Sequence, residues 1–69
     1  MTILAVDTTT KSCSAAVVSK SRLLSEITLE NDQTHAKHLM NIVDQVLEMA
    51  GISLDKLDGF AVTRGPGSF

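Results

Sequence analysis

Residues 35–63, HAKHLMNIVDQVLEMAGISLDKLDGFAVT, hold a helix pattern followed by a strand pattern, and this pair decides the fold. Over residues 35–50, apolar side chains recur at three- and four-residue intervals, which is typical of an amphipathic helix that ends at Gly51. Gly59–Thr63 is a short apolar run typical of a strand. A helix between two strands favours a crossover, so the strand at 59–63 is predicted to lie parallel to the first strand.

Three strand patterns precede the helix. Thr2–Val6 is nearly continuous in apolar residues, Cys13–Val18 follows it, and Arg22–Glu30 alternates in part. The connections between them are short, which favours an antiparallel meander. The predicted order is therefore β-β-β-α-β with a mixed sheet, an α/β fold. This is the order of the first half of a ribonuclease-H-like or actin-like ATPase domain, which normally has at least one more helix and strand.

Length and composition limit what the chain can do alone. The 69 residues are 43% hydrophobic and 20% charged, with a net charge of −2, which indicates one soluble globular domain at most. A basic stripe is lacking, and the only aromatic residues are two phenylalanines, so direct binding of tRNA or DNA is poorly supported. The apolar runs are shorter than a membrane span of about 20 residues, and no signal peptide is evident. The predicted location is the reduced cytoplasm.

A chain of this size has little stability to spare. Its one cysteine, Cys13, cannot form an intramolecular disulfide and is interpreted as a small strand residue. Below about 70–80 residues, a single core rarely supplies more than ~3–5 kcal/mol. The missing stability is expected to come from a partner or from further sequence.

The helical stretch carries more apolar surface than one core needs. Its apolar side chains cover an arc of roughly 180°, whereas a helix on one core needs a stripe of roughly 100°. We predict that Met40, Val43 and Leu47 face the sheet and that the other half faces a partner helix. The alternative is a larger core that covers both halves. The predicted interface residues are His35, His38, Leu39, Ile42, Val46 and Met49.

Two polar loops follow strand patterns and are candidate anion sites. Actin-like ATPases place a phosphate loop of the form Asp-x-Gly-Ser/Thr after the first strand, but Asp7–Thr10 lacks the glycine that lets backbone approach phosphate. The loop Arg64–Ser68 could present backbone N–H groups to an anion, although Pro66 removes one donor, and a structural turn is the alternative. The candidate nucleotide or anion residues are Asp7, Thr8, Thr9, Arg64, Gly65 and Gly67.

Metal chemistry is not predicted. His35 and His38 are neighbours on one side of the helix start, but a metal site needs three or four ligands, and no third one is evident nearby. A ribonuclease-H-like nuclease would need further carboxylates beside Asp7. Asp44 and Glu48 fall on the polar face of the helix, away from the sheet. We therefore expect no metal and no cofactor.

Four stretches together resemble the N-terminus of the bacterial TsaB family, also called YeaZ, of the tRNA threonylcarbamoyladenosine pathway. They are ILAVDTT at 3–9, CSAA at 13–16, His35 with Leu39, and DGFAVTRGPGSF at 58–69, the last being the most specific. The resemblance covers the whole chain in order. Because family members are much longer, residues 1–69 are expected to be a truncated N-terminal actin-like (ASKHA) domain. The rest of that domain and the second domain would be absent.

The resemblance implies a non-catalytic scaffold that pairs with a TsaD-like catalytic subunit through helices. It further implies a TsaE-like ATPase in the complex, a homodimer when the chain is alone, only indirect contact with tRNA, and no membrane. TsaD binds metal through a histidine pair at i and i+4. His35 and His38 are three residues apart, so that role is not carried over. The alternatives are a kinase-like ATPase of the actin-like superfamily and a small dimerisation module that folds unaided.

Overall fold

The computed structural model describes residues 1–8, 12–30 and 36–64 of the chain. Three strands come first, then one long helix, a short 3₁₀ turn and a last strand, which confirms the predicted order. The helix ends at Ala50, as predicted, and Gly51 follows with a φ of +70°, the left-handed conformation that suits a glycine after a helix. The elements are β1 (Thr2–Thr8), β2 (Ser12–Ser19), β3 (Arg22–Glu30), α1 (Ala36–Ala50), the 3₁₀ turn (Leu54–Lys56) and β4 (Gly59–Arg64).

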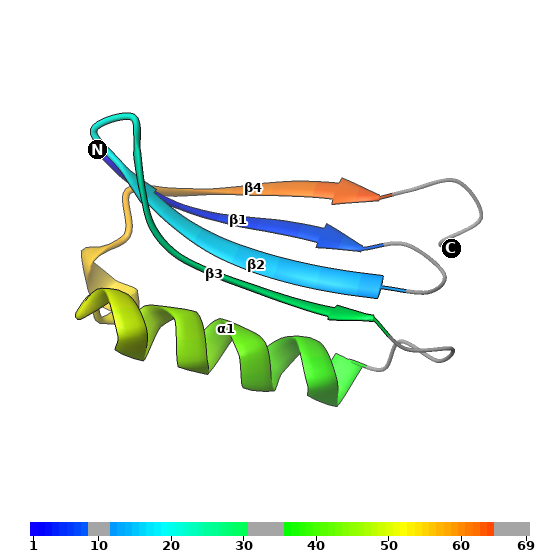
Figure 1. The fold of residues 1–69 in the computed structure, drawn as a ribbon. Helices are drawn as coiled ribbons and strands as arrows, with labels where there is room; N and C mark the ends of the chain where they lie inside the picture. The colour runs from blue at the N-terminus through cyan, green and yellow to red at the C-terminus, as the bar shows by residue number, and fades with distance from the viewer. Residues whose placement is uncertain (9–11, 31–35, 65–69) are drawn as a thin grey trace.

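The four strands form one mixed sheet of order β3-β2-β1-β4 (Figure 1). β1 pairs antiparallel with β2, and β2 pairs antiparallel with β3. β4 pairs parallel with β1, with Ile3 opposite Gly59 and Thr8 opposite Arg64. The predicted meander and the predicted parallel crossover are therefore confirmed. Because β1 and β4 are parallel, their C-terminal ends lie side by side at the same end of the sheet.

The entry to β4 is fastened to the start of β1. The backbone N–H of Thr2 donates to Asp58 Oδ2 at 2.7 Å, and the backbone N–H of Asp58 donates to the carbonyl of Thr2 at 2.8 Å. These two hydrogen bonds hold the chain beside β1 as it returns from α1 and the 3₁₀ turn. They set the register in which β4 adds to the sheet.

The β2–β3 hairpin turns at Lys20 and Ser21, which have φ values of 54° and 64°. Positive φ at both central residues is the backbone of a type I′ turn, whose twist matches the twist of the two strands. β3 then carries one extra residue, Leu24, because Val17 lies opposite Ser25 and Val18 opposite Leu23. This bulge bends the edge strand and sets which of its side chains face the helix.

Replacing Lys20-Ser21 with Asn-Gly is expected to stabilise the chain by about 1 kcal/mol, because asparagine and glycine tolerate the left-handed conformation that other residues adopt at a cost. Urea unfolding followed by circular dichroism measures this change. The control is Thr28→Gly on the exposed face of β3, where added backbone freedom should lower the stability. A loss of stability in the Asn-Gly variant would contradict the assigned turn.

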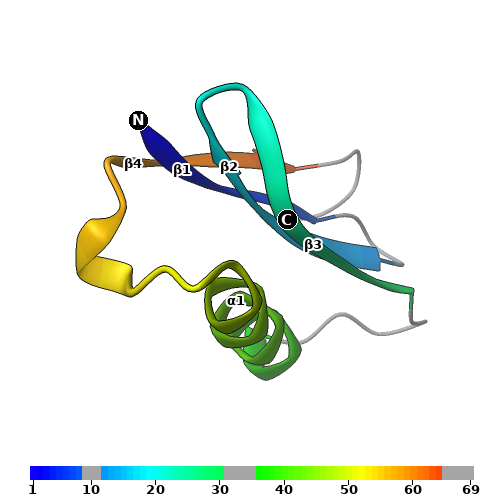
Figure 2. The same cartoon turned by 60° about the vertical axis from the view of Figure 1, so that its left-hand side comes forward.

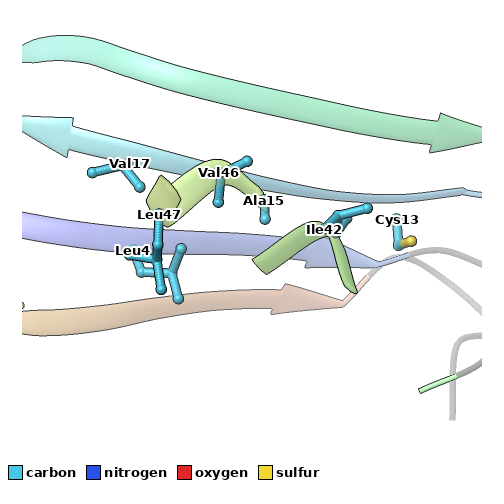
Figure 3. Packing of buried hydrophobic residues seen from close by; sticks show 7 residues of the cluster. All are labelled: Leu4, Cys13, Ala15, Val17, Ile42, Val46 and Leu47. Atoms are coloured by element: carbon cyan, nitrogen blue, oxygen red, sulfur yellow. The ribbon is translucent and has the colours of Figure 1, made fainter. Parts of the chain in front are cut away.

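The hydrophobic core lies between the sheet and α1, which packs on one face against β2 and β3 (Figure 1, Figure 2). Small side chains on β2 bring the helix close, since Ala15 is fully buried there. The Ser25 hydroxyl on β3 donates a buried hydrogen bond of 2.7 Å to the carbonyl of Val46. This bond ties the middle of α1 to the edge strand. The core residues are Leu4, Cys13, Ala15, Val17, Ile42, Val46 and Leu47 (Figure 3).

The predicted division of the helix into a sheet half and a partner half is wrong for three residues. Ile42 and Val46, predicted to face a partner, are 6% and 0% exposed and belong to the core. Met40, predicted to face the sheet, is 58% exposed. The physical reason is that the middle of the wide apolar arc faces the sheet, whereas the prediction had divided the arc between the sheet and a partner. Its two ends, Met40 and Met49, are therefore the residues left in solvent.

Cys13 behaves as the strand residue that the sequence predicts. Its side chain is 2% exposed among the other core residues, and burial raises the pKa of its thiol because the thiolate would lose its hydration. A protonated thiol in this position is a poor nucleophile and a poor metal ligand. Cys13 is therefore a packing residue.

The free energy of unfolding is expected to fall as the pH rises above about 9. The thiol of Cys13 ionises near its ordinary pKa of 9.0 in the unfolded chain but resists ionisation in the folded chain. The unfolded state then binds fewer protons, and the stability falls with a slope of at most about 1.4 kcal/mol per pH unit. Urea titrations between pH 7 and 10 measure the slope. Cys13→Ala should reduce it, and an unchanged slope in that variant would contradict the assignment.

Candidate functional site

At the end of the sheet where β1 and β4 both finish, three of the predicted anion-binding residues come close in the backbone, namely Asp7, Thr8 and Arg64. Thr8 lies opposite Arg64 in the parallel register, and Asp7 lies opposite Thr63. On the other side of β1, Asp7 lies opposite Ser14 of β2. The remaining predicted residues of this group, Thr9, Gly65 and Gly67, lie outside the described residues.

Asp7 and Thr8 cannot serve one ligand with both side chains, because successive residues of a strand point to opposite faces of the sheet. Thr8 is 7% exposed on the face that α1 covers, whereas Asp7 is exposed on the other face. The Asp7 carboxylate also repels an anion. Its neighbours across the strands, Ser14 and Thr63, supply hydroxyl groups instead. The described residues at the ends of β1 and β4 therefore fit a polar strand end better than a phosphate-binding site.

Over the described ranges of the chain, no three His, Cys, Asp or Glu side chains lie close enough together to hold a metal ion. His38 is half-buried on α1, and its predicted neighbour His35 lies outside those ranges. The described parts of the molecule also lack a helix long and apolar enough to cross a membrane.

The outer surface of α1 is the second candidate site. Met49 is 63% exposed on one flank and Met40 is 58% exposed on the other. Leu39 packs at the margin of the core. Of the six predicted interface residues, Met49 is therefore the one large apolar side chain that the structure leaves exposed. Between the two flanks lie the exposed polar residues Asn41, Asp44, Gln45 and Glu48.

The sequence reasoning missed two exposed apolar residues of β4. Phe60 and Val62 are each 66% exposed. Their signal is present in the alternation of β4, which places them in register with Leu4 and Val6 of β1.

Comparison with known proteins gives the family. Residues 22–69 match the family model described as TsaD, tRNA N6-adenosine threonylcarbamoyltransferase. The chain therefore belongs to this family, whose curated members that match it act in tRNA threonylcarbamoyladenosine biosynthesis. Within the family, matches to TsaB sequences and to a YeaZ structure that cover 99–100% of this chain make it similar to the N-terminal part of TsaB, also called YeaZ.

The individual relatives give the measure of this similarity. The chain is 36% identical over 69 residues to the tRNA threonylcarbamoyladenosine biosynthesis protein TsaB of Haemophilus influenzae, covering 100% of the chain and 29% of that protein. It is 37% identical over 83 residues to the tRNA N6-adenosine threonylcarbamoyltransferase of Geobacter sp., and this alignment covers 97% of the chain and 24% of that protein. The structure of YeaZ from Pseudomonas aeruginosa superposes with a TM-score of 0.85 and 37% identity, covering 99% of this chain and 32% of that one. The chain thus spans about a third of these relatives or less.

Proposed function

We propose that this chain serves tRNA threonylcarbamoyladenosine biosynthesis as part of a non-catalytic TsaB-type scaffold that pairs with a TsaD-type catalytic subunit. The observation that carries the proposal is the way the two kinds of relative align. The TsaB relative aligns over 69 positions with the 69-residue chain. The transferase relative aligns over 83 positions, so it has inserted residues that this chain and the TsaB relative lack.

The chemistry of the strand edge supports a scaffold over an enzyme. A phosphate-binding strand end needs backbone N–H groups and a glycine that lets a phosphate approach, whereas β1 ends in Asp7-Thr8. The Asp7 carboxylate lies among hydroxyl groups of neighbouring strands, without a metal cluster in the described residues beside it. The catalytic groups, the contact with tRNA and the attachment of a TsaE-type ATPase then belong to the assembled complex.

The surface proposed for the catalytic partner is the Met49 flank of α1. This flank combines an exposed methionine with Gln45, Asn41 and the half-buried His38, which lie on the same side of the helix by their spacing. A partner helix laid along it would bury Met49 while the core side of α1 stays on the sheet. Methionine adapts its shape to such a contact.

Met49→Lys is expected to weaken binding of the TsaD-type subunit of the same organism by about tenfold or more, because a charge would be buried at the helix contact. Isothermal titration calorimetry measures the binding, and tRNA modification by the mixed proteins measures the function. Met40→Lys, on the opposite flank of the same helix, is the matched control and should bind as the wild type does. Equal loss in both variants would contradict the assigned flank. Modification of tRNA by the chain alone would contradict the scaffold role.

A further inference from the structure

The outer edge of β3 is an exposed surface distinct from the outer surface of α1. β3 stands first in the strand order β3-β2-β1-β4, so it pairs with β2 on one side and with no strand of the described residues on the other (Figure 1). An edge strand leaves the backbone N–H and C=O groups of alternate residues without a strand partner. The bulge at Leu24 interrupts the regular pairing, which leaves residues 25–30 as a regular segment about 20 Å long.

The two faces of this segment differ in their chemistry. Ile27 and Leu29 are half-buried and pack against the core on the helix side of the sheet. Glu26 and Glu30 are exposed on the opposite side, since alternate residues of a strand point to opposite faces. Both glutamates lie opposite neutral residues of β2. The negative charge along the outer face of the edge is therefore not offset from the side of β2.

We propose that the β3 edge binds an extended segment of a partner protein, in which cationic and apolar residues alternate, as an added strand. The backbone of the segment pairs with the outward N–H and C=O groups of residues 25–30, as in other cases where a peptide extends a sheet. Its lysine or arginine side chains lie beside Glu26 and Glu30, and opposite charges on neighbouring strands stabilise the pairing. Its apolar side chains lie beside Ile27 and Leu29.

The helix provides a cover for the apolar side of such a strand. α1 packs on β2 and β3, and the Ser25 hydroxyl donates to the carbonyl of Val46 at 2.7 Å, so the middle of α1 lies over β3. Leu47 points to the side of Leu4, toward β1 (Figure 3). Met49 is 63% exposed on the other flank of the helix, above the side on which a strand adds to β3. Apolar side chains of the added strand therefore gain burial beneath this flank.

The two glutamates disfavour the other occupants of this edge. In the antiparallel register that aligns residues 26–30 of two copies, Glu26 of one copy lies opposite Glu30 of the other, and like charges directly opposite each other are destabilising. Nucleic acid and anionic membrane surfaces are repelled by the carboxylates. The two carboxylates are roughly 13 Å apart along the strand, too far to bind one metal ion together. A cationic strand is the occupant that the charges favour.

NMR titration of the isotopically labelled chain with acetyl-Lys-Val-Thr-Val-Lys-amide tests the proposal. We expect saturable shifts of the backbone amides of residues 25–30 and of their neighbours on β2, with a dissociation constant below about 1 mM. Every second amide of residues 25–30 should exchange with solvent more slowly in the complex. The matched peptide acetyl-Glu-Val-Thr-Val-Glu-amide should not bind, because it places carboxylates beside Glu26 and Glu30.

Changes to the protein and to the peptide backbone separate strand pairing from simple charge attraction. The double variant Glu26→Gln/Glu30→Gln should weaken binding of the lysine peptide by about fivefold, since each exposed ion pair contributes modestly. Glu48→Gln removes an exposed carboxylate of α1 and is the matched control, which should bind as the wild type does. N-methylation of the peptide amides that face β3 should abolish binding, whereas N-methylation of those that face away should not.

Equal binding of the two peptides, or equal binding of the two N-methylated forms, would overturn the proposal, because either result would mean a contact without strand pairing. Absence of binding at several millimolar lysine peptide would overturn it as well. Shifts of the β3 amides when the chain is concentrated without peptide would assign the edge to a second copy instead. The peptide comparison needs only the wild type, so a variant that fails to fold leaves it intact. The TsaD-type subunit takes no part in this measurement, so the scaffold role and the strand site can fail separately.

Discussion

Val46→Asp is expected to leave the chain without measurable helical structure. Val46 is 0% exposed and lies in the core beside β2, where its own carbonyl accepts the hydrogen bond from Ser25. A carboxylate placed there loses its hydration without gaining a cationic partner, at a cost of several kcal/mol. A chain of this size has only about 3–5 kcal/mol of core stability to lose. The substitution therefore removes the fold and not merely a contact.

Far-ultraviolet circular dichroism gives the measurement, and Gln45→Asp gives the matched control. Gln45 is the neighbouring residue of the helix and is exposed. Aspartate at position 45 therefore has the same low helix propensity as aspartate at position 46 and interacts with the helix dipole to nearly the same extent. Its helical signal should stay close to that of the wild type. If Val46→Asp folds normally and loses only partner binding, then the original interpretation of Val46 as an interface residue is correct and the core described above is wrong.

The position of Val46 also shows that the sequence predicts where α1 lies in the chain but not which of its sides faces the sheet. Apolar periodicity predicted the helix and its end at Ala50, because that signal is local. It could not tell that the wide arc is centred on the sheet, since the direction of the arc depends on where α1 crosses β2 and β3. Ile42 and Val46 were consequently assigned to a partner, and Met40 was assigned to the core.

The strand ends show a second limit. β1 continues through Asp7 and Thr8, two residues beyond its apolar run, because β2 supplies backbone hydrogen bonds to polar and apolar residues alike. The parallel pairing of β4 with β1 was predictable from the intervening helix. This pairing brings Asp7, Thr8 and Arg64 to the same end of the sheet. The opposite directions of the Asp7 and Thr8 side chains follow only once both residues are known to lie in the strand. A loop of the same sequence could have held both on one ligand.

Leu4→Ala is expected to cost about 3 kcal/mol, the second largest effect among these variants and most of the stability that the chain has. Leu4 is 3% exposed on β1, which pairs with β2 on one side and β4 on the other. Its side chain joins the β1 side of the sheet to Leu47 of α1 within a cluster of seven buried apolar residues (Figure 3). Since α1 packs mainly against β2 and β3, few other side chains can fill the cavity that alanine would leave.

Urea unfolding of Leu4→Ala and of Leu54→Ala compares the same substitution in two environments. Leu54 is 60% exposed in the 3₁₀ turn, so its truncation removes little buried surface and should change the stability by less than about 1 kcal/mol. Equal losses in the two variants would mean that Leu4 is not packed as described. A large loss confined to Leu4→Ala would show that β1 is anchored to the helix through this contact. The exposed side chains of Phe60 and Val62 on β4 lie in register with Leu4 and Val6, so they flank the part of the core that this contact holds.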